Sequence, residues 1–301
     1  MAIAVIGTGL AGLACAQELT NAGKDVILFD KSRGYGGRMA TRRRDGFTFD
    51  HGLPAFDPVA VETIPALSAL PEWGAFGRVA PPRMNAFARD IGETFKSRMG
   101  ARITRIDFDT LAITDETGET HDGLSHIVIA IPAPQASALL GNYGEVFAAL
   151  ETAQYTPGWT LLLGGIGDTV EQMDRSEPPD GPLALVIRND AKPGYPAQHP
   201  CYVAHARIDW AIANLERSPD DVAAELCQAF TALTGLDAQS AAYCGMHRWR
   251  FCRPLQVLDA PFLLSADGRI GACGDWAGSD RSGGDARAAW RSGEALARAM
   301  V

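Results

Sequence analysis

The residues whose spacing points most directly to chemistry are Gly7, Gly9 and Gly12, which stand in the hexapeptide Gly-Thr-Gly-Leu-Ala-Gly. A turn of this kind lets backbone N–H groups and the positive end of a helix approach a pyrophosphate, because no side chain blocks the way. Asp30 follows at about the 20-residue distance at which an acid accepts hydrogen bonds from an adenosine ribose. The pattern predicts a dinucleotide site, whose contacts also include Leu10 and Ala11.

This site needs a strand before the glycine turn and a helix after it. Residues 2–6 form a short apolar run typical of a strand buried in a parallel sheet, and residues 13–19 have helical composition up to a stop near Gly23. Residues 26–29 predict a second strand, which ends at Asp30. A turn that binds nothing is the alternative for the hexapeptide alone, but the strand, helix and acid in register favour a bound dinucleotide.

A second glycine-rich element runs from Lys31 to Met39 and contains Gly36 and Gly37 between Arg33 and Arg38. The arginines can supply cations to a pyrophosphate while the glycine backbone passes close to a ribityl chain. A basic surface loop is the alternative, and it is the simpler interpretation for residues 42–44, which are three consecutive arginines. The acid and the element after it resemble the end of the second strand and the R-x-G-G-R-like stretch of the flavin-dependent amine oxidase superfamily, and this resemblance implies FAD over NAD.

Segments spread over the whole chain resemble the flavin-dependent amine oxidase superfamily, and within it the bacterial renalase-like proteins. The segments that carry the resemblance are Ile6–Leu13, Leu28–Met39, Asp50–Gly52, Ile127–Ser137, His247–Phe251, Cys273–Trp276 and Ala289–Gly293. The resemblance implies an α/β, p-hydroxybenzoate-hydroxylase-like flavoprotein fold. A discontinuous Rossmann-type FAD domain would comprise residues 1–55, 85–135 and 265–301, with a β-rich substrate domain in residues 56–84 and 136–264.

The patterns of the individual segments agree with that architecture. Residues 101–108 and 111–115 read as a hairpin, residues 127–131 as a buried strand and residues 135–140 as a helix. Ser218 caps a helix that begins at Pro219 and runs to Thr234. Further predicted strands are residues 160–167, 183–188, 201–208 and 270–273, and a last helix covers residues 285–300.

The resemblance also carries cofactor contacts onto residues outside the glycine turns. Asp275 matches an aspartate that bonds the ribityl chain, although a turn cap is its alternative, and the backbone of Ile103 would lie beside the adenine. The last helix would turn its positive end to the flavin. No cysteine matches a covalent attachment site, so FAD is expected to be non-covalent. The remaining contacts are Asp50, His51, Gly52, Pro132, Gly274, Trp276, Ala288 and Ala289.

His247 and Trp249 are the predicted catalytic residues. A flavin takes a hydride at N5, so the protein supplies orientation, a suitable field and a dry pocket. The His247 ring can hold a substrate amide or a nicotinamide-like carbonyl, and a core histidine bonded to backbone is its alternative. Trp276 and residues 51–56 would complete the walls, although tryptophans are more often core residues.

The chain departs from the family at two places. Members commonly have a Gln-Tyr pair after the Asp-x-Gly segment, where this chain has Pro54 and Ala55. The stretch between Phe56 and Pro82 is also shorter, so we expect a trimmed cover over the flavin. Residues 279–284 form a polar insertion, which either closes over a ligand or is simply solvated.

The first functional hypothesis is a renalase-like enzyme that oxidises the 2- and 6-dihydro isomers of NAD(P)H and passes the electrons to oxygen, giving hydrogen peroxide. The second is an amine oxidase or desaturase for another small molecule, favoured by the lost Gln-Tyr pair. Such relatives often use a lysine near N5, and this chain has only Lys24, Lys31, Lys96 and Lys192. The third is a flavin-binding protein without turnover.

Composition limits the remaining possibilities. A chain of 301 residues forms one large domain or two, and its net charge of −9 (27 − 36) argues against a nucleic-acid partner. No apolar run approaches the ~20 residues that span a bilayer, so no membrane partner is expected. The six cysteines contain no C-x-x-C pair and no zinc-site spacing. We expect reduced thiols, no metal, and a soluble cytoplasmic protein whose partner is a small-molecule substrate.

Overall fold

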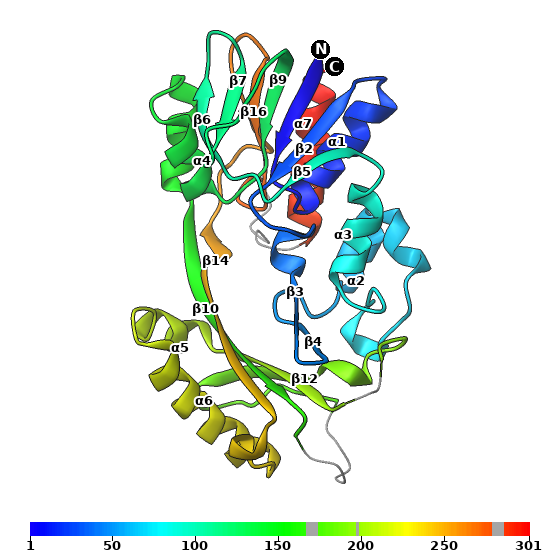
Figure 1. Cartoon of the computed structure of the whole chain (residues 1–301), viewed down its shortest axis with the longest axis vertical. Helices are drawn as coiled ribbons and strands as arrows, with labels where there is room; N and C mark the ends of the chain where they lie inside the picture. Colours follow the sequence, from blue (N-terminus) through cyan, green and yellow to red (C-terminus); the bar gives the residue numbers. More distant parts are fainter. Residues whose placement is uncertain (167–173, 197–198, 279–285) are drawn as a thin grey trace.

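A computed structural model describes residues 1–166, 174–196, 199–278 and 286–301. Two main sheets dominate these ranges, one at each end of an elongated molecule (Figure 1). The long strands β10 (Gln154–Gly164) and β14 (Tyr243–Gln256) run from one end toward the other. The predicted α/β class with a second, β-rich layer is confirmed. The predicted insertion at residues 279–284 lies outside the described ranges.

The first sheet, called the parallel sheet, is built around the N-terminal strand. Its strands lie in the order β15-β16-β9-β1-β2-β5, and within these ranges only β15 runs antiparallel to its neighbour. The order brings both termini of the chain into one layer. The bounds are β1 Ala2–Ile6, β2 Val26–Asp30, β5 Lys96–Met99, β9 Leu124–Ile129, β15 Leu263–Leu264 and β16 Ile270–Ala272.

The two faces of the parallel sheet follow from alternation along its strands. Ile3 and Val5 pack against helices α1 (Leu10–Asn21) and α7 (Ala286–Ala299). Ala4 and Ile6 face the opposite side. That side is covered by a small sheet and a helix, whose bounds are β6 Ile103–Asp107, β7 Ala112–Asp115, β8 Thr120–His121 and α4 Ala133–Leu140, followed by the 3-10 helix η4 Glu145–Thr152.

Close backbone contacts explain why α1 begins inside the glycine hexapeptide rather than after it. A Cβ on Gly12 would lie 2.0 Å from the carbonyl oxygen of Gly7, and one on Gly293 of α7 would lie 2.1 Å from that of Ala11. Gly7 itself has φ +108°, which a residue with a side chain rarely adopts. The glycines therefore fix how closely strand, turn and both helices approach.

Residues 37–95 form short elements between strands β2 and β5 of the parallel sheet. The hairpin of β3 (Thr41–Arg44) and β4 (Phe47–Asp50) lies between the sheets in Figure 1. The predicted surface loop at residues 42–44 is wrong, because these arginines form β3 and Arg42 is half-buried. The other elements are η1 Gly37–Met39, α2 Pro58–Thr63, η2 Pro65–Ala69, η3 Gly74–Phe76 and α3 Asn85–Gly92.

The shortened stretch between Phe56 and Pro82 is a packed unit. Its side chains Ile64, Leu67, Trp73 and Val79 are buried in the core that also holds α1 and α7. Within this stretch the structure has helical turns and isolated bridges but no extended strand. The stretch is therefore a structural support for the parallel sheet.

The second sheet, called the antiparallel sheet, has the order β11-β12-β13-β10-β14 with antiparallel neighbours. Trp159, Leu161 and Leu163 of β10 point to one face, where helices α5 (Ile208–Ala213) and α6 (Pro219–Thr234) cover them. The other bounds are β11 Arg175–Ser176, β12 Leu183–Arg188, η5 Asn189–Ala191, β13 Cys201–Ala206 and η6 Ala238–Ser240.

Local signals located most elements well. Ser218 caps α6 by accepting a hydrogen bond from the Asp221 backbone at 3.1 Å, as its sequence predicts. The prediction missed the start of β10 and the whole of β14, whose apolar and basic residues alternate without a turn signal. The domain division at residues 56, 85, 136 and 265 stays a prediction. None of the helices within the described ranges is long and apolar enough to cross a membrane.

A buried ion pair ties the β3–β4 hairpin to the antiparallel sheet. Lys192 Nζ lies 2.8 Å from Asp50 Oδ2, and neither side chain is exposed. The second oxygen of Asp50 accepts hydrogen bonds from the Thr41 hydroxyl at 2.6 Å and the Met84 amide at 3.0 Å. Asp50 thus joins three separate segments.

Lys192→Met should lower the free energy of unfolding by about 3–5 kcal/mol, because it leaves the buried Asp50 carboxylate without a counter-charge. Urea unfolding followed by tryptophan fluorescence measures the change. The double variant Asp50→Asn with Lys192→Met should lose less than the sum of the single variants. Wild-type stability of Lys192→Met would show that this pair does not hold the segments together.

Candidate functional site

Two glycine turns face each other at the end of the parallel sheet. A Cβ on Gly9 would meet no described atom within 4 Å, and one on Gly37 would lie 3.5 Å from the Gly9 Cα. The Gly36 amide donates to the Thr8 carbonyl at 2.9 Å, which fixes the second turn over the first. Helix α1 begins at this point with Leu10 and Ala11. A backbone cradle with open space at Gly9 fits a pyrophosphate.

Asp30 is held in place at the end of β2. Its Oδ2 accepts from the amide and the hydroxyl of Thr8, both at 2.7 Å, and its Oδ1 accepts from the Ser32 amide at 2.8 Å. Since a carboxylate has further lone pairs and this one is half-buried, it can still accept from a ribose. Lys31 and Arg33 beside it are exposed.

Arg38 and Asp275, predicted as separate cofactor contacts, bind each other. The guanidinium donates to both carboxylate oxygens at 2.6 and 2.7 Å, and also to the Cys252 carbonyl at 3.3 Å. Burial works to lower the Arg38 pKa, but the Asp275 charge outweighs it and raises this pKa. Arg38, which was expected to provide positive charge for a pyrophosphate, therefore has its charge partner within the protein. The Tyr155 hydroxyl lies 3.5 Å from Asp275 Oδ1 and extends the network.

Asp50 and Trp276, predicted as cofactor contacts, both have partners within the protein, and their contacts with a cofactor stay predictions. Asp50 uses both carboxylate oxygens on protein donors, as described above. The Trp276 ring has no exposed surface, and its indole N–H donates to the Ile131 carbonyl at 3.1 Å. The ring belongs to the core under the small sheet, in agreement with the alternative that this tryptophan is a core residue.

The other predicted contacts are distributed around the cradle. Met39 and Gly274 are buried, Pro132 precedes α4, and Ile103 opens β6. Ala288 and Ala289 lie near the beginning of the described part of α7. These positions stay predictions as cofactor contacts.

The face of the antiparallel sheet opposite its helices carries a transverse row of polar side chains. Thr160 of β10 is the direct cross-strand partner of His205 on one side and of His247 on the other. Directly opposite residues share a face, so all three side chains point away from the helices. Trp249 lies on the same face, two residues beyond His247 on β14.

This row meets the turn after β4. The His51 carbonyl accepts from the Thr160 hydroxyl at 3.3 Å and from the Trp249 indole N–H at 3.2 Å. The His51 ring stacks on Trp249 with a centroid distance of 5.2 Å and meets the edge of His247 at 4.6 Å. A Cβ on Gly52 would lie 3.4 Å from the Trp249 ring. The structure therefore brings the predicted residues His51, Gly52, His247 and Trp249 together.

Arg42 fixes the tautomer of His247. Its guanidinium donates to His247 Nδ1 at 3.0 Å and to the Met246 carbonyl at 3.1 Å. A guanidinium can only donate, so Nδ1 accepts and the ring proton resides on Nε2. His247 thus has one N–H donor available for a substrate oxygen.

All three histidines of this cluster favour the neutral form. Burial lowers the pKa of His51 to about 4 and that of His247 to about 3, and the nearby Arg42 charge adds to both shifts. Burial, with help from Lys192, lowers the pKa of His205 to about 4. The cluster therefore donates and accepts hydrogen bonds at neutral pH but does not supply positive charge through its imidazoles.

Sequence reasoning missed Arg42, Thr160, His205 and the placement of Lys192. Thr160 and His205 fall in strands that were predicted, so the alternation along each strand could have placed them on one face. Their pairing required the register between strands, which no local signal gives. Arg42 was indistinguishable in the sequence from Arg43 and Arg44, which are exposed.

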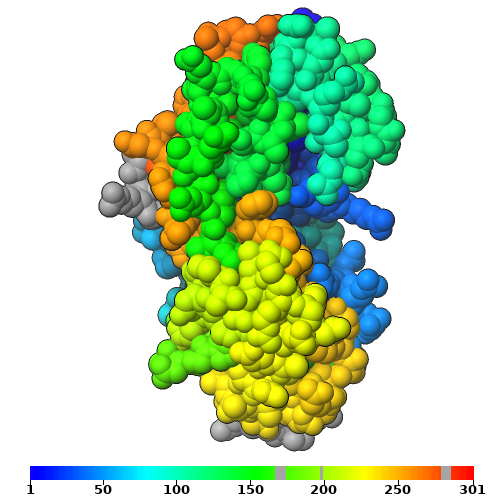
Figure 2. Space-filling view, turned by 90° about the vertical axis from the view of Figure 1, so that its left-hand side faces the viewer, coloured from blue at the N-terminus to red at the C-terminus, as the bar shows by residue number. Residues whose placement is uncertain are grey.

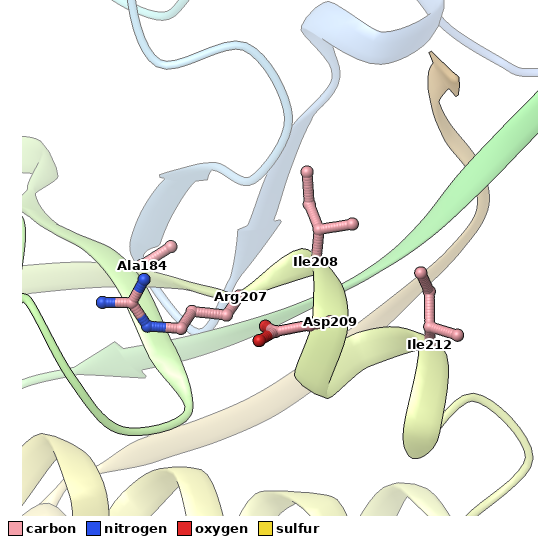
Figure 3. Close-up of a pocket in the computed structure, with 5 residues that line it drawn as sticks. All are labelled: Ala184, Arg207, Ile208, Asp209 and Ile212. Atoms are coloured by element: carbon pink, nitrogen blue, oxygen red, sulfur yellow. The ribbon is translucent and has the colours of Figure 1, made fainter. Parts of the chain in front are cut away.

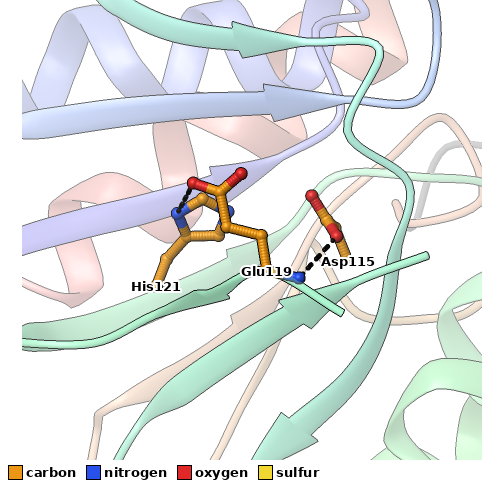
Figure 4. Close-up of side chains that lie close together, drawn as sticks. All are labelled: Asp115, Glu119 and His121. Atoms are coloured by element: carbon orange, nitrogen blue, oxygen red, sulfur yellow. Dashed lines mark hydrogen bonds and ion pairs between the residues drawn. The ribbon is translucent and has the colours of Figure 1, made fainter. Parts of the chain in front are cut away.

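Asp115, Glu119 and His121 form a group whose possible ligand atoms lie within 4.8 Å of one another (Figure 4). Asp115 Oδ1 already accepts hydrogen bonds from the amide and hydroxyl of Thr117 and from the Glu119 amide. These bonds shape the turn between β7 and β8. The arrangement is explained by the turn without an ion.

A hollow of about 500 Å³ opens beside α5 (Figure 3). Ile208 and Ile212 point from the helix in the same direction, and they are 45% and 54% exposed. The other lining residues are Ala184, Arg207 and Asp209. None of them was a predicted site residue, and none belongs to the histidine cluster.

Comparisons with known proteins agree with the cradle. A family model described as an NAD(P)-binding Rossmann-like domain matches residues 5–67. The 4,4'-diapophytoene desaturase (4,4'-diaponeurosporene-forming) of Staphylococcus aureus strain Newman is 50% identical over 52 residues, which are 17% of this chain. The same protein of strain USA300 matches equally. The matched segment spans about a tenth of the length of these desaturases.

Solved structures match nearly the whole chain. Putrescine oxidase bound to putrescine has a TM-score of 0.64 at 12% identity, covering 99% of this chain and 98% of that chain. Cyclohexylamine oxidase from Brevibacterium oxydans IH-35A has a TM-score of 0.64 at 13% identity, with the same coverage. The fold is that of the amine oxidases. Reduced UDP-galactopyranose mutase is also similar, with a TM-score of 0.65 at 12% identity, covering 98% and 93%.

The amine oxidase fold confirms the predicted architecture of a Rossmann-type part with a β-rich second part. In it, the glycine cradle belongs to the parallel sheet, and the histidine cluster belongs to the contact between the antiparallel sheet and the turn after β4. The likeness at these low identities concerns the fold, and the activity has to be argued from the residues themselves.

Stability should decrease as the pH falls from 6.5 toward about 4. Above pH 6.5 these histidines are neutral in the folded and in the unfolded chain. Below pH 6.5 they take up protons in the unfolded chain, whereas the lowered pKa values of His51, His205 and His247 oppose this in the folded chain, so unfolding is favoured. His247→Gln removes one of these groups and should flatten the dependence. Urea unfolding at several pH values measures it.

His199→Gln, which removes an exposed histidine, is the matched control and should keep the wild-type dependence. A His247→Gln profile that coincides with the wild-type profile would mean that His247 takes up its proton equally in the folded state.

Proposed function

We propose that this chain is an FAD-dependent oxidoreductase that oxidises a small molecule. The observation that carries the proposal is the meeting of the turn after β4 with the polar face of the antiparallel sheet. His51, Gly52, His247 and Trp249 come together there, and the Leu53 amide after them donates to the Arg38 carbonyl beside the second glycine turn. Substrate sites of two-part α/β proteins commonly lie at such an interface.

FAD would be held through the backbone cradle of Gly9 and Gly37 and through Asp30. When bound, it supplies a hydride acceptor at N5 and passes the electrons on to oxygen, giving hydrogen peroxide. Binding is proposed to be non-covalent. The match of residues 5–67 to the Rossmann-like family model supports this part of the proposal, because the glycine cradle lies in these residues.

Within this class we favour renalase-like oxidation of 2- or 6-dihydro isomers of NAD(P)H. The support is the charge distribution of the cluster. Arg42 lies against His247, the imidazoles are neutral, and the buried Asp50 is already paired with Lys192. A cationic amine would find no free carboxylate among these residues, whereas the His247 Nε2–H can donate to a carboxamide oxygen.

Oxidation of an amine is the second candidate, supported by the likeness to putrescine and cyclohexylamine oxidases. In this chain Lys192 is buried with Asp50, so this lysine has a structural partner. A flavin-binding protein without turnover is the third.

Anaerobic mixing of the purified yellow protein with dihydronicotinamide isomers should bleach the flavin band within the first turnover. Mass spectrometry after denaturation should find released, unmodified FAD. Bleaching by an amine panel instead would overturn the renalase-like assignment and support the second candidate. An oxidised flavin that neither set bleaches would support the third, and a chain that binds no FAD would overturn the whole proposal.

Three ligands of similar shape and different charge test the charge argument. Benzoate and benzamide should perturb the flavin spectrum at concentrations at least about tenfold below that required by benzylamine, because Arg42 and the His247 N–H favour acceptors. Arg42→Met should weaken the binding of benzoate by about tenfold and the binding of benzamide by less than about threefold. Arg44→Met, on the same face of β3 but exposed, is the control. Preferential binding of benzylamine would contradict the argument.

A further inference from the structure

Two cysteines from different elements meet on the helix-covered side of the antiparallel sheet. The Sγ atoms of Cys227 on α6 and Cys244 on β14 lie 3.9 Å apart, and both are free thiols. This site lies on the face of the sheet opposite the histidine cluster.

The fold dictates this contact from both sides. Cys227 belongs to the buried stripe of α6, with Val222, Leu226 and Phe230. Cys244 is the cross-strand partner of Leu163, which points to the same helices. The alternation of β14 therefore turns Cys244 to α6 and His247 to the other face.

The two thiols differ in access and acidity. Cys227 is 4% exposed, whereas Cys244 is exposed at the edge strand of the sheet. The hydrogen bond with Cys227 lowers the pKa of Cys244, which favours the thiolate of the exposed partner. Among the other thiols, Cys15, Cys201 and Cys273 are buried and Cys252 is half-buried.

We propose that Cys227 and Cys244 form a redox-active pair that hydrogen peroxide converts to a reversible disulfide between α6 and β14. The sulfurs have to approach by about 2 Å to reach bonding distance. Rotation of the exposed Cys244 side chain can supply this movement, because one side of it faces solvent.

The reaction balances as two successive displacements. The Cys244 thiolate attacks one peroxide oxygen, the O–O bond breaks, and the leaving hydroxide takes up a proton to give water and a sulfenic acid on Cys244. The Cys227 sulfur then attacks the Cys244 sulfur, the S–O bond breaks, and hydroxide leaves with the Cys227 proton as a second water. The two thiols lose two electrons and two protons, and the peroxide gains them.

The test treats the purified, fully reduced chain with a small excess of hydrogen peroxide. The number of thiols detected after denaturation should fall from the six of the sequence to four, and dithiothreitol should restore six. Peptide mapping without reduction should show one bond, between the peptides that contain Cys227 and Cys244. The thiols of Cys227 and Cys244 should be lost at least about tenfold faster than any other thiol.

Variants separate the two steps. Cys244→Ser should keep all its thiols during this treatment, whereas Cys227→Ser should stop at a Cys244 sulfenic acid, which dimedone traps. Cys201→Ser is the matched control, because its hydroxyl can replace the thiol that donates to the His199 carbonyl, and it should lose two thiols like the wild type. Retention of all six thiols in the wild type, or a bond that maps to another cysteine pair, would overturn the proposal.

Discussion

The carbonyl oxygen of His51 is the point on which the candidate site depends. It accepts hydrogen bonds from Thr160 and Trp249, which belong to the antiparallel sheet, while its own chain segment continues from the hairpin that follows the cofactor cradle. This backbone group thus joins the turn after β4 to two neighbouring strands of the antiparallel sheet. The stacking of the His51 ring on Trp249 fixes the orientation of the His51 side chain.

Two ion pairs support this junction from either side. Asp50 and Lys192 hold the hairpin on the antiparallel sheet, and Arg38 and Asp275 hold the second glycine turn on the end of the parallel sheet. Each pair satisfies a buried charge, so neither partner can move alone without a large cost. Burial and the nearby charges of Arg42 and Lys192 keep the histidines neutral in this region.

Local chemistry made much of the fold predictable. The structure has the glycine turn, the acid at the end of β2 and the helix start at Ser218-Pro219. Each of these features is encoded by a few neighbouring residues. Thr160, His205 and Arg42 could not be assigned in this way, because their roles arise from register between distant strands. Trp276 shows a second limit: the resemblance implied a cofactor contact, and only the structure shows that its ring packs under the small sheet.

Strand β14 has a further property that follows from its place in the sheet. Strand β14 is fourteen residues long and pairs only with β10 in the described sheet, so its outer edge would be a template on which a second chain could add a strand. Arg248, Arg250 and Arg253 place like charges along this edge, and Pro254 removes one donor from it. The same strand that carries His247 and Trp249 therefore also carries protection against aggregation.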